Sequence, residues 1–240
     1  MKGTADLCIR SVTPSHIPSH TPQHSASVRV WDLPTRLFHW LLLACVIGLF
    51  ATAYAPGSWI DWHARLGYAL LTLLLFRLVW GVIGGHWSRF IHFVPRSGSS
   101  VSLGHTLSGA LAVMAMLLAL IAQVTTGLVG DDEIAFTGPL NRYISTDLGL
   151  AATAWHKGVG QWLLVGLIAL HLSAIAFYFF VRRNNLVGPM VHGDKPLPDG
   201  AQSVLSAPVA SRDTAGSRLL ALAVLGGCAG AVTLMVRLAG

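Results

Sequence analysis

The sequence predicts an all-α integral membrane protein, with a four-helix transmembrane bundle and one additional transmembrane helix near the C-terminus. Two features of the composition support this. Apolar residues make up 53% of the 240 residues, and charged residues make up 11%, against about 25% in an ordinary soluble domain. A soluble globule of this size would lack the polar residues to cover its surface. A disordered chain would need lower hydrophobicity and higher charge.

Five apolar runs, each about 18–23 residues long, supply the predicted helices. A helix rises 1.5 Å per residue, so each run can cross the roughly 30 Å of hydrocarbon in a bilayer. Backbone polar groups must be satisfied internally in lipid, which makes helices the expected form. The predicted spans are residues 37–55, 66–83, 107–128, 159–181 and 219–236.

Lys and Arg are distributed unequally between the predicted loops. With a cytoplasmic N-terminus, eleven of them fall on the inside and four on the outside. Basic loops remain in the cytoplasm, so this bias predicts that orientation. The same loops account for the net charge of +6, and we expect no nucleic-acid partner. The outside four are Arg65, Arg142, Lys157 and Arg237; the inside group is Lys2, Arg10, Arg29, Arg36, Arg89, Arg96, Arg182, Arg183, Lys195, Arg212 and Arg218.

The chain divides into four predicted parts. Residues 1–28 are polar and predict a disordered tail, and residues 29–193 hold the four-helix bundle. Residues 194–218 predict a cytoplasmic linker, and residues 219–240 hold the extra helix. The tail contains His16, His20 and His24, but interleaved prolines exclude the helix that would align them. A metal site in the tail is therefore only a weak alternative.

Four other histidines lie within the predicted helices or immediately before them. His39 starts the first helix on the inside, and His63 immediately precedes the second on the outside. His156 begins the fourth helix on the outside, and His171 follows fifteen residues later, about 22 Å toward the inside. Ionisable residues in membrane segments are costly and usually functional. The depths therefore predict an inner pair, His39 with His171, and an outer pair, His63 with His156.

These pairs match the axial ligation of haem iron. Fifteen residues at about 100° each leave His156 and His171 about 60° apart, so both can face the bundle interior. One His from each of two helices at equal depth can hold an iron from both sides, and bundle cores are where such cofactors are built. Zinc would need three or four ligands in a cluster, which fits two histidines at each depth poorly. His105, at the start of the third helix, is the alternative ligand.

Two glycines follow the outer histidines at helical spacing. Gly67 is four residues after His63, and Gly160 is four residues after His156, so each pair shares a helix face. A missing side chain there leaves room for a flat macrocycle, or it lets membrane helices pack closely. Both interpretations remain open from the sequence.

Arg77 is the only charge well inside a predicted span. It can extend to the lipid headgroups, or it can pair with a haem propionate, because Arg matches a carboxylate with two hydrogen bonds. Arg36 and Lys157, near the depths of the two predicted haems, are weaker candidates for the same role.

Four stretches of the chain carry a family resemblance: VRVWDLPTRLFHW, WIDWHARLGY, LLLFRLVWGVIGG and AWHKGVGQWLLVGLIALHL. They resemble the bacterial cytochrome b561 and nickel–iron hydrogenase b-type cytochrome family over about residues 28–193. The resemblance implies a di-haem b protein of the bacterial inner membrane that passes electrons between quinol and a redox partner. That partner would be a hydrogenase, a dehydrogenase subunit or a periplasmic c-type cytochrome. The family's ligand positions match His39, His63, His156 and His171.

The predicted function is transmembrane electron transfer through two b-type haems, between the quinone pool and a partner protein. One alternative is direct oxidation of a small reductant such as superoxide, with quinone reduction. A non-redox metal transporter is less favoured, because it would need ligands near the bilayer midplane. The outer acidic stretch of residues 131–133 is either a docking surface for a basic partner or a solvated loop.

Overall fold

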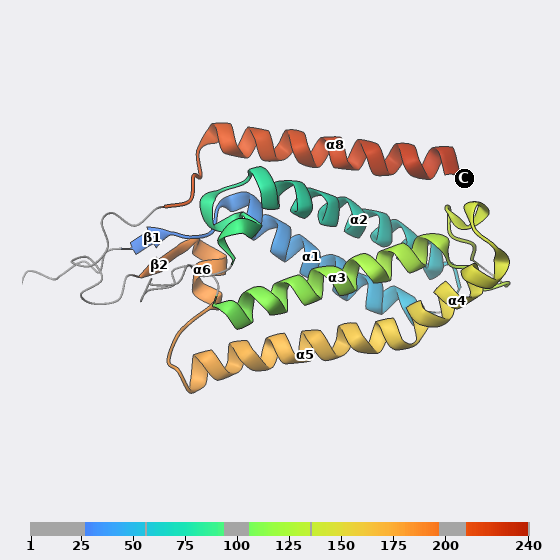
Figure 1. The fold of residues 1–240 in the computed structure, drawn as a ribbon, viewed down its shortest axis with the longest axis horizontal. Helices are drawn as coiled ribbons and strands as arrows, with labels where there is room; N and C mark the ends of the chain where they lie inside the picture. The colour runs from blue at the N-terminus through green and yellow to red at the C-terminus, as the bar shows by residue number, and fades with distance from the viewer. Residues whose placement is uncertain (1–26, 56, 94–105, 135, 197–209, 240) are drawn as a thin grey trace, which may run out of the picture.

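The computed structural model describes residues 27–55, 57–93, 106–134, 136–196 and 210–239. The predicted tail up to residue 26, His105 and most of the predicted linker lie outside these ranges. The long helices are α1 (Leu33–Ala53), α2 (Trp59–Ile83), α3 (Leu107–Val129), α4 (Thr146–Lys157), α5 (Val159–Phe180) and α8 (Ala215–Ala239) (Figure 1). The shorter elements are β1 (Ser27–Arg29), η1 (His86–Ser88), η2 (Phe90–His92), η3 (Asn141–Tyr143), α6 (Val187–His192) and β2 (Asp194–Pro196).

Among the described residues, five helical segments are long and apolar enough to cross a membrane. They are α1, α2, α3, α8 and the stretch Thr146–Phe180, which combines α4 and α5. The predicted fold class, an all-α membrane protein with a further C-terminal span, is confirmed. α1 begins four residues before the predicted start, because Asp32 caps it and accepts a hydrogen bond from the Thr35 amide.

The helices run side by side, and α8 and α5 lie at opposite edges (Figure 1). α2 packs against α1, α3 and α8, and α3 packs against α4 and α5. The buried core is correspondingly centred on α2 and α3. It includes Leu74, Phe76 and Trp80 of α2, with Leu120 and Val124 of α3.

His156 and His171 were predicted to lie on one continuous helix, but the structure places them on two, α4 and α5. The predicted span of residues 159–181 corresponds to α5. Gly158 ends α4 by donating its amide to the carbonyls of Ala154 and Trp155, and α5 begins at the next residue. Its backbone angles, φ −107° and ψ −109°, are not helical. His156 therefore lies on α4 and His171 on α5, so the 60° rotation calculated for one continuous helix does not apply.

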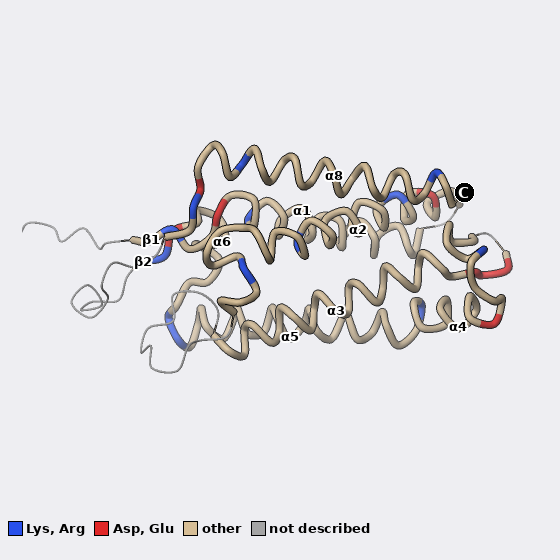
Figure 2. Tube along the Cα trace, turned by 45° about the horizontal axis from the view of Figure 1, so that its top comes forward, with Lys and Arg blue, Asp and Glu red and all other residues tan. Residues whose placement is uncertain are grey.

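A cap of short elements closes the end of the bundle that carries β1, β2 and α6, where Lys and Arg gather (Figure 2). β1 and β2 pair antiparallel, with Ser27 opposite Pro196. Arg29 makes ion pairs of 2.6 Å with Asp194 and 2.7 Å with Asp213, the latter just before α8. The described ends of the predicted tail and linker are thus tied to the bundle.

Candidate haem-binding histidines

The outer pair of histidines meets in the structure. His63 lies in the first turns of α2, inside the helix that was predicted to start after it, and His156 lies in the last turn of α4. Their ring centroids are 6.1 Å apart, and the ring planes are nearly perpendicular at 83°. Both side chains are half-buried. Residues 93 positions apart in the chain therefore form one site.

Each ring of the outer pair is held by its Nδ1 atom. His63 Nδ1 lies 3.0 Å from the Leu49 carbonyl on α1, and His156 Nδ1 lies 2.8 Å from the Gln123 carbonyl on α3. A carbonyl oxygen only accepts hydrogen bonds, so Nδ1 must carry the proton and donate it. In a neutral imidazole the lone pair is then on Nε2, which is the form that ligates a metal ion.

A threonine supports each of these contacts. Thr52 Oγ1 on α1 lies 3.4 Å from His63 Nδ1, and Thr126 Oγ1 on α3 lies 3.3 Å from His156 Nδ1. Each hydroxyl donates to the carbonyl four residues earlier in its own helix, at 2.7 Å for Thr52 and 2.8 Å for Thr126. The carbonyl that holds the histidine is three residues before the threonine in both cases. The same anchor therefore occurs twice, once for each ring.

The separation of the rings fits two ligands on one iron. An imidazole has a radius of about 1.1 Å for bonds near 1.35 Å, and a bond from histidine nitrogen to a metal is about 2.1 Å. Rings on opposite sides of one metal ion then have centroids about 6.4 Å apart, close to the 6.1 Å between His63 and His156. The residues present therefore fit a bis-histidine haem.

The two neighbouring glycines serve different purposes. A side chain at Gly67 would meet nothing within 4 Å, so this position faces open space. One at Gly160 would collide with Gln123 and Trp155, so that glycine allows close packing of α5. A third glycine, Gly127 on α3, lets His156 approach: an added Cβ would lie 3.1 Å from the ring. Room for a macrocycle is thus seen at Gly67, and helix packing at Gly160.

The inner pair is also brought together, although its contacts are fewer. His39 on α1 and His171 on α5 are half-buried and lie within electrostatic range of one another. The Nδ1 atom of His39 is buried and has no hydrogen-bond partner among the described residues. A buried ring nitrogen without a partner is expected where a group binds that the described residues do not supply. In the described ranges, no group of three or more His, Cys, Asp or Glu side chains could hold a metal ion.

Arg77 lies away from solvent, in a buried cluster below the cap. Its side chain is 4% exposed, and Nη1 donates to the Ser88 carbonyl at 3.0 Å. The guanidinium also stacks over Phe90, 4.7 Å from the ring centroid. It therefore does not reach the headgroups. The two weaker candidates already have protein partners: Arg36 donates to the Val191 carbonyl, and Lys157 lies 3.5 Å from Asp132.

Asp32 was not predicted from the sequence as a structural residue. It joins three parts of the capped end of the bundle, which carries His39 and is called the inner end. Its carboxylate is fully buried and accepts hydrogen bonds from Trp80 Nε1, the Gly85 amide and Ser88 Oγ as well as from the Thr35 amide. A signal was present, because Asp followed by Leu-Pro before an apolar run is a helix start. Thr52, Gln123 and Thr126 carried no comparable signal, since their role depends on which helices pack together.

Comparison with known proteins identifies the family. The family model described as prokaryotic cytochrome b561 matches residues 30–193. The chain belongs to this family. It is a multi-pass membrane cytochrome that transfers electrons with b-type haem, as expected from the sequence. α8 and the segment before it lie outside the matched residues.

Two relatives of the cytochrome are described as subunits of hydrogenases. The probable Ni/Fe-hydrogenase B-type cytochrome subunit of Azotobacter chroococcum mcd 1 is 23% identical over 217 residues, which cover 72% of this chain and 90% of the relative. The probable Ni/Fe-hydrogenase 1 B-type cytochrome subunit of Escherichia coli strain K12 is 20% identical over 210 residues, covering 68% and 88%. No solved structure matches the cytochrome.

Proposed function

We propose that this cytochrome carries electrons across the bacterial inner membrane through two b-type haems, between the quinone pool and a redox partner protein. His63 and His156 would hold the outer haem, and His39 and His171 the inner one. The observation that carries the proposal is the outer pair, with two rings 6.1 Å apart and both Nδ1 atoms anchored to carbonyls. The N-terminus would lie in the cytoplasm.

The protein's own contribution is to position the ligands and set their basicity. A bound haem supplies an iron that gains and loses one electron at a time. The Nδ1–H···O=C contacts fix the tautomer and the ring orientation of His63 and His156, so that Nε2 points away from the helix that anchors each ring. Such outer-shell hydrogen bonds also make the ligand nitrogen more electron-rich, which is one way a protein tunes a haem.

At the inner end, we propose that Arg77 supplies positive charge to the inner haem through a propionate. One of its five N–H groups is bonded to Ser88, which leaves others for a carboxylate. Its burial makes the charge effective, since few water molecules screen it. Asp32 is the buried acidic group in electrostatic range of the guanidinium.

The partner we favour is a Ni/Fe hydrogenase, because the relatives named above are described as its cytochrome subunits. A dehydrogenase or a periplasmic c-type cytochrome would use the same haems with a different donor. Two carboxylates of the acidic stretch also have a structural role. Asp131 and Asp132 are bonded to amides of their own loop, those of Glu133 and Ile134, and so shape that loop.

Counting haems tests the proposal. A pyridine haemochrome assay and a reduced-minus-oxidised spectrum of the purified chain should give two low-spin b haems. H63A and H156A should each lose the same haem, and H39A and H171A should each lose the other. The pairing is wrong if H63A and H156A remove spectrally different haems. One haem in the unaltered chain would contradict the two-haem proposal.

A further inference from the structure

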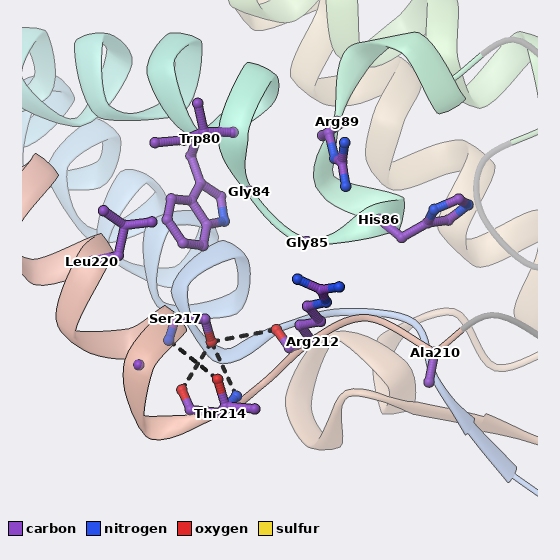
Figure 3. Close-up of a pocket in the computed structure, with 12 residues that line it drawn as sticks. Trp80, Gly84, Gly85, His86, Arg89, Ala210, Arg212, Thr214, Ser217 and Leu220 are labelled. Carbon is purple, nitrogen blue, oxygen red and sulfur yellow. Dashed lines mark hydrogen bonds between the residues drawn. The ribbon is translucent and has the colours of Figure 1, made fainter.

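A cavity of about 480 Å³ lies at the capped end of the bundle, between the end of α2 and the start of α8. Trp80 and Leu220 lie together on one side of it (Figure 3). Ile83 also lines the cavity and adds to its apolar surface. The opposite part is lined by cationic side chains, Arg89 from the loop after α2 and Arg212 from the segment before α8. The cavity is thus amphipathic, with apolar residues on one side and arginines on the other.

The two arginines have no acidic partner among the described residues. Arg89 Nε is buried there without a hydrogen-bond acceptor. Arg212 is exposed, and its neighbour in sequence, Asp213, is already paired with Arg29 and Arg218. Two uncompensated guanidinium groups beside one cavity favour a ligand with negative charge and several oxygen acceptors, as a phosphate group has.

The polar groups of the α8 start are already used within the chain. The Thr214 amide donates to Ser217 Oγ, and the Ser217 amide donates to Thr214 Oγ1 (Figure 3). Ser217 Oγ in turn donates to the Thr214 carbonyl at 2.8 Å. Ligand recognition therefore falls to the arginines, together with His86. Burial, and then the charges of His92 and Arg89, lower the pKa of His86, so its imidazole is neutral near pH 7 and can donate without adding charge.

We propose that this cavity binds the headgroup of an anionic phospholipid, with its acyl chains against the apolar surface of α2 and α8. The phosphate would lie between Arg89 and Arg212, at the end of the bundle where basic residues gather. Basic pockets between transmembrane helices on the cytoplasmic side are suited to such headgroups. The chains would continue along Ile83 and Leu220, both 47% exposed. The lipid would hold α8, which the family match does not include, to the shared four-helix bundle.

Native mass spectrometry of the purified full-length cytochrome tests this. Delipidated protein in detergent is titrated with phosphatidylglycerol, with phosphatidylcholine of the same acyl chains, and with inorganic phosphate. We expect one tightly held phosphatidylglycerol and much weaker phosphatidylcholine. R89Q/R212Q should bind phosphatidylglycerol roughly 30-fold more weakly, from the loss of two charges near an anionic group.

The matched control is R182Q/R183Q, which removes two exposed arginines after α5 at the same end of the bundle. It should bind like the unaltered chain, and an equal loss in both double variants would mean that only general surface charge matters. Equal binding of both lipids, or displacement of the lipid by millimolar phosphate, would also overturn the lipid assignment. If R89Q/R212Q fails to keep its haem spectrum, R212Q alone serves, because Arg212 is exposed; it should weaken binding about fivefold.

Discussion

The two ends of the bundle use their polar contacts differently. At the outer end, helix carbonyls and threonine hydroxyls hold His63 and His156 in place. At the inner end, hydrogen bonds converge on Asp32 and ion pairs on Asp213, while His39 Nδ1 has no bond among the described residues. The outer ligand site is therefore formed by the protein itself. The inner end mainly ties β1, β2 and the segment before α8 to the bundle, and it gives His39 Nδ1 no comparable anchor among the described residues.

The largest expected effect comes from removing one ligand at each end. H156A and H171A should each leave one haem per chain, but the remaining haem should differ in how firmly it is held. The outer haem left in H171A should resist extraction by acid or apomyoglobin longer than the inner haem left in H156A, because its rings are preorganised. Equal extraction rates would show that the anchors of the outer rings do not contribute to retention.

The next largest effect concerns the buried carboxylate of the inner end. D32A removes a helix cap, worth about 1 kcal/mol, and leaves the Trp80 indole and the Gly85 amide without their acceptor. Each buried donor left unpaired costs about 1–3 kcal/mol. We expect earlier unfolding in a titration with sodium dodecyl sulfate, followed by far-ultraviolet circular dichroism.

D32N is the matched control for that change, because its amide oxygen can still accept hydrogen bonds at the same position. It should lose less stability than D32A. The spectrum of the outer haem should be unaltered in both folded variants. A D32A protein as stable as the unaltered chain would show that the cluster around Asp32 does not stabilise the inner end.

Substitutions of Arg77 distinguish an electrostatic role of this residue from a purely structural one. R77Q removes a buried positive charge, and a haem iron is easier to reduce beside such a charge. A redox titration should therefore show a lower midpoint potential for the inner haem and an unchanged one for the outer haem. R77K keeps the charge and should restore most of the potential. If stability falls but neither potential moves, Arg77 serves only to hold Ser88 and the ring of Phe90.

A smaller effect is expected from the threonine anchors. T52V and T126V keep the size of the side chain but remove the hydroxyl near Nδ1, while the carbonyl contact remains. Losing an outer-shell hydrogen bond to a ligand typically costs about 10–100-fold in metal affinity, and the low end applies because one partner is left. Electron paramagnetic resonance should show altered g-values for the outer haem alone. A change at the inner haem would contradict the assignment of these threonines.

T72V is the matched control for the threonine variants. Thr72 on α2 also donates to the carbonyl four residues before it, that of Tyr68, at 2.9 Å, but it makes no hydrogen bond to a histidine among the described residues. Its replacement should leave both haem signals unchanged. A shift in T72V as large as in T126V would mean that the effect comes from the helix and not from the ligand.

The fold and the site could be predicted from the sequence to different degrees at the two ends of the bundle. The membrane helices follow from local runs of apolar residues, and the four histidines from their depth along those runs. The break at Gly158 was missed because His156 and His171 were assigned to one continuous helix, and a glycine is common within membrane helices, so its presence marks no break. The anchors of the outer histidines are backbone carbonyls, which every residue has, so only the packing of α1 on α2 and α3 on α4 selects Leu49 and Gln123.

The smallest expected effect is a pH dependence of the inner cap. Hydrogen bonding to Arg29 lowers the pKa of Asp194, and hydrogen bonding to Arg218 and then Arg29 lowers that of Asp213. Because the pKa of each carboxyl group is lower in the folded state, the ionised groups stabilise the cap at every pH above their unfolded pKa, about 3.9. The stabilisation is lost as the pH falls through the pKa of the folded state. The pairs should therefore be intact from neutral pH down to about 4.

Hydrogen exchange of the Val30 and Trp31 amides, which bond to the Gly193 carbonyl, reports on that cap. After correction for the intrinsic exchange rate, their protection should be constant near neutral pH and should fall below about pH 4. In D194N/D213N it should be lower at neutral pH and no longer depend on pH in this range. The ion pair of α4, between Lys157 and Asp132 at 3.5 Å, is largely exposed on the lysine side and contributes little, so amides of α4 should keep their protection. If α4 amides lose protection together with those of Val30 and Trp31, the two ends unfold as one unit. Their different polar contacts would then not give them different local stabilities.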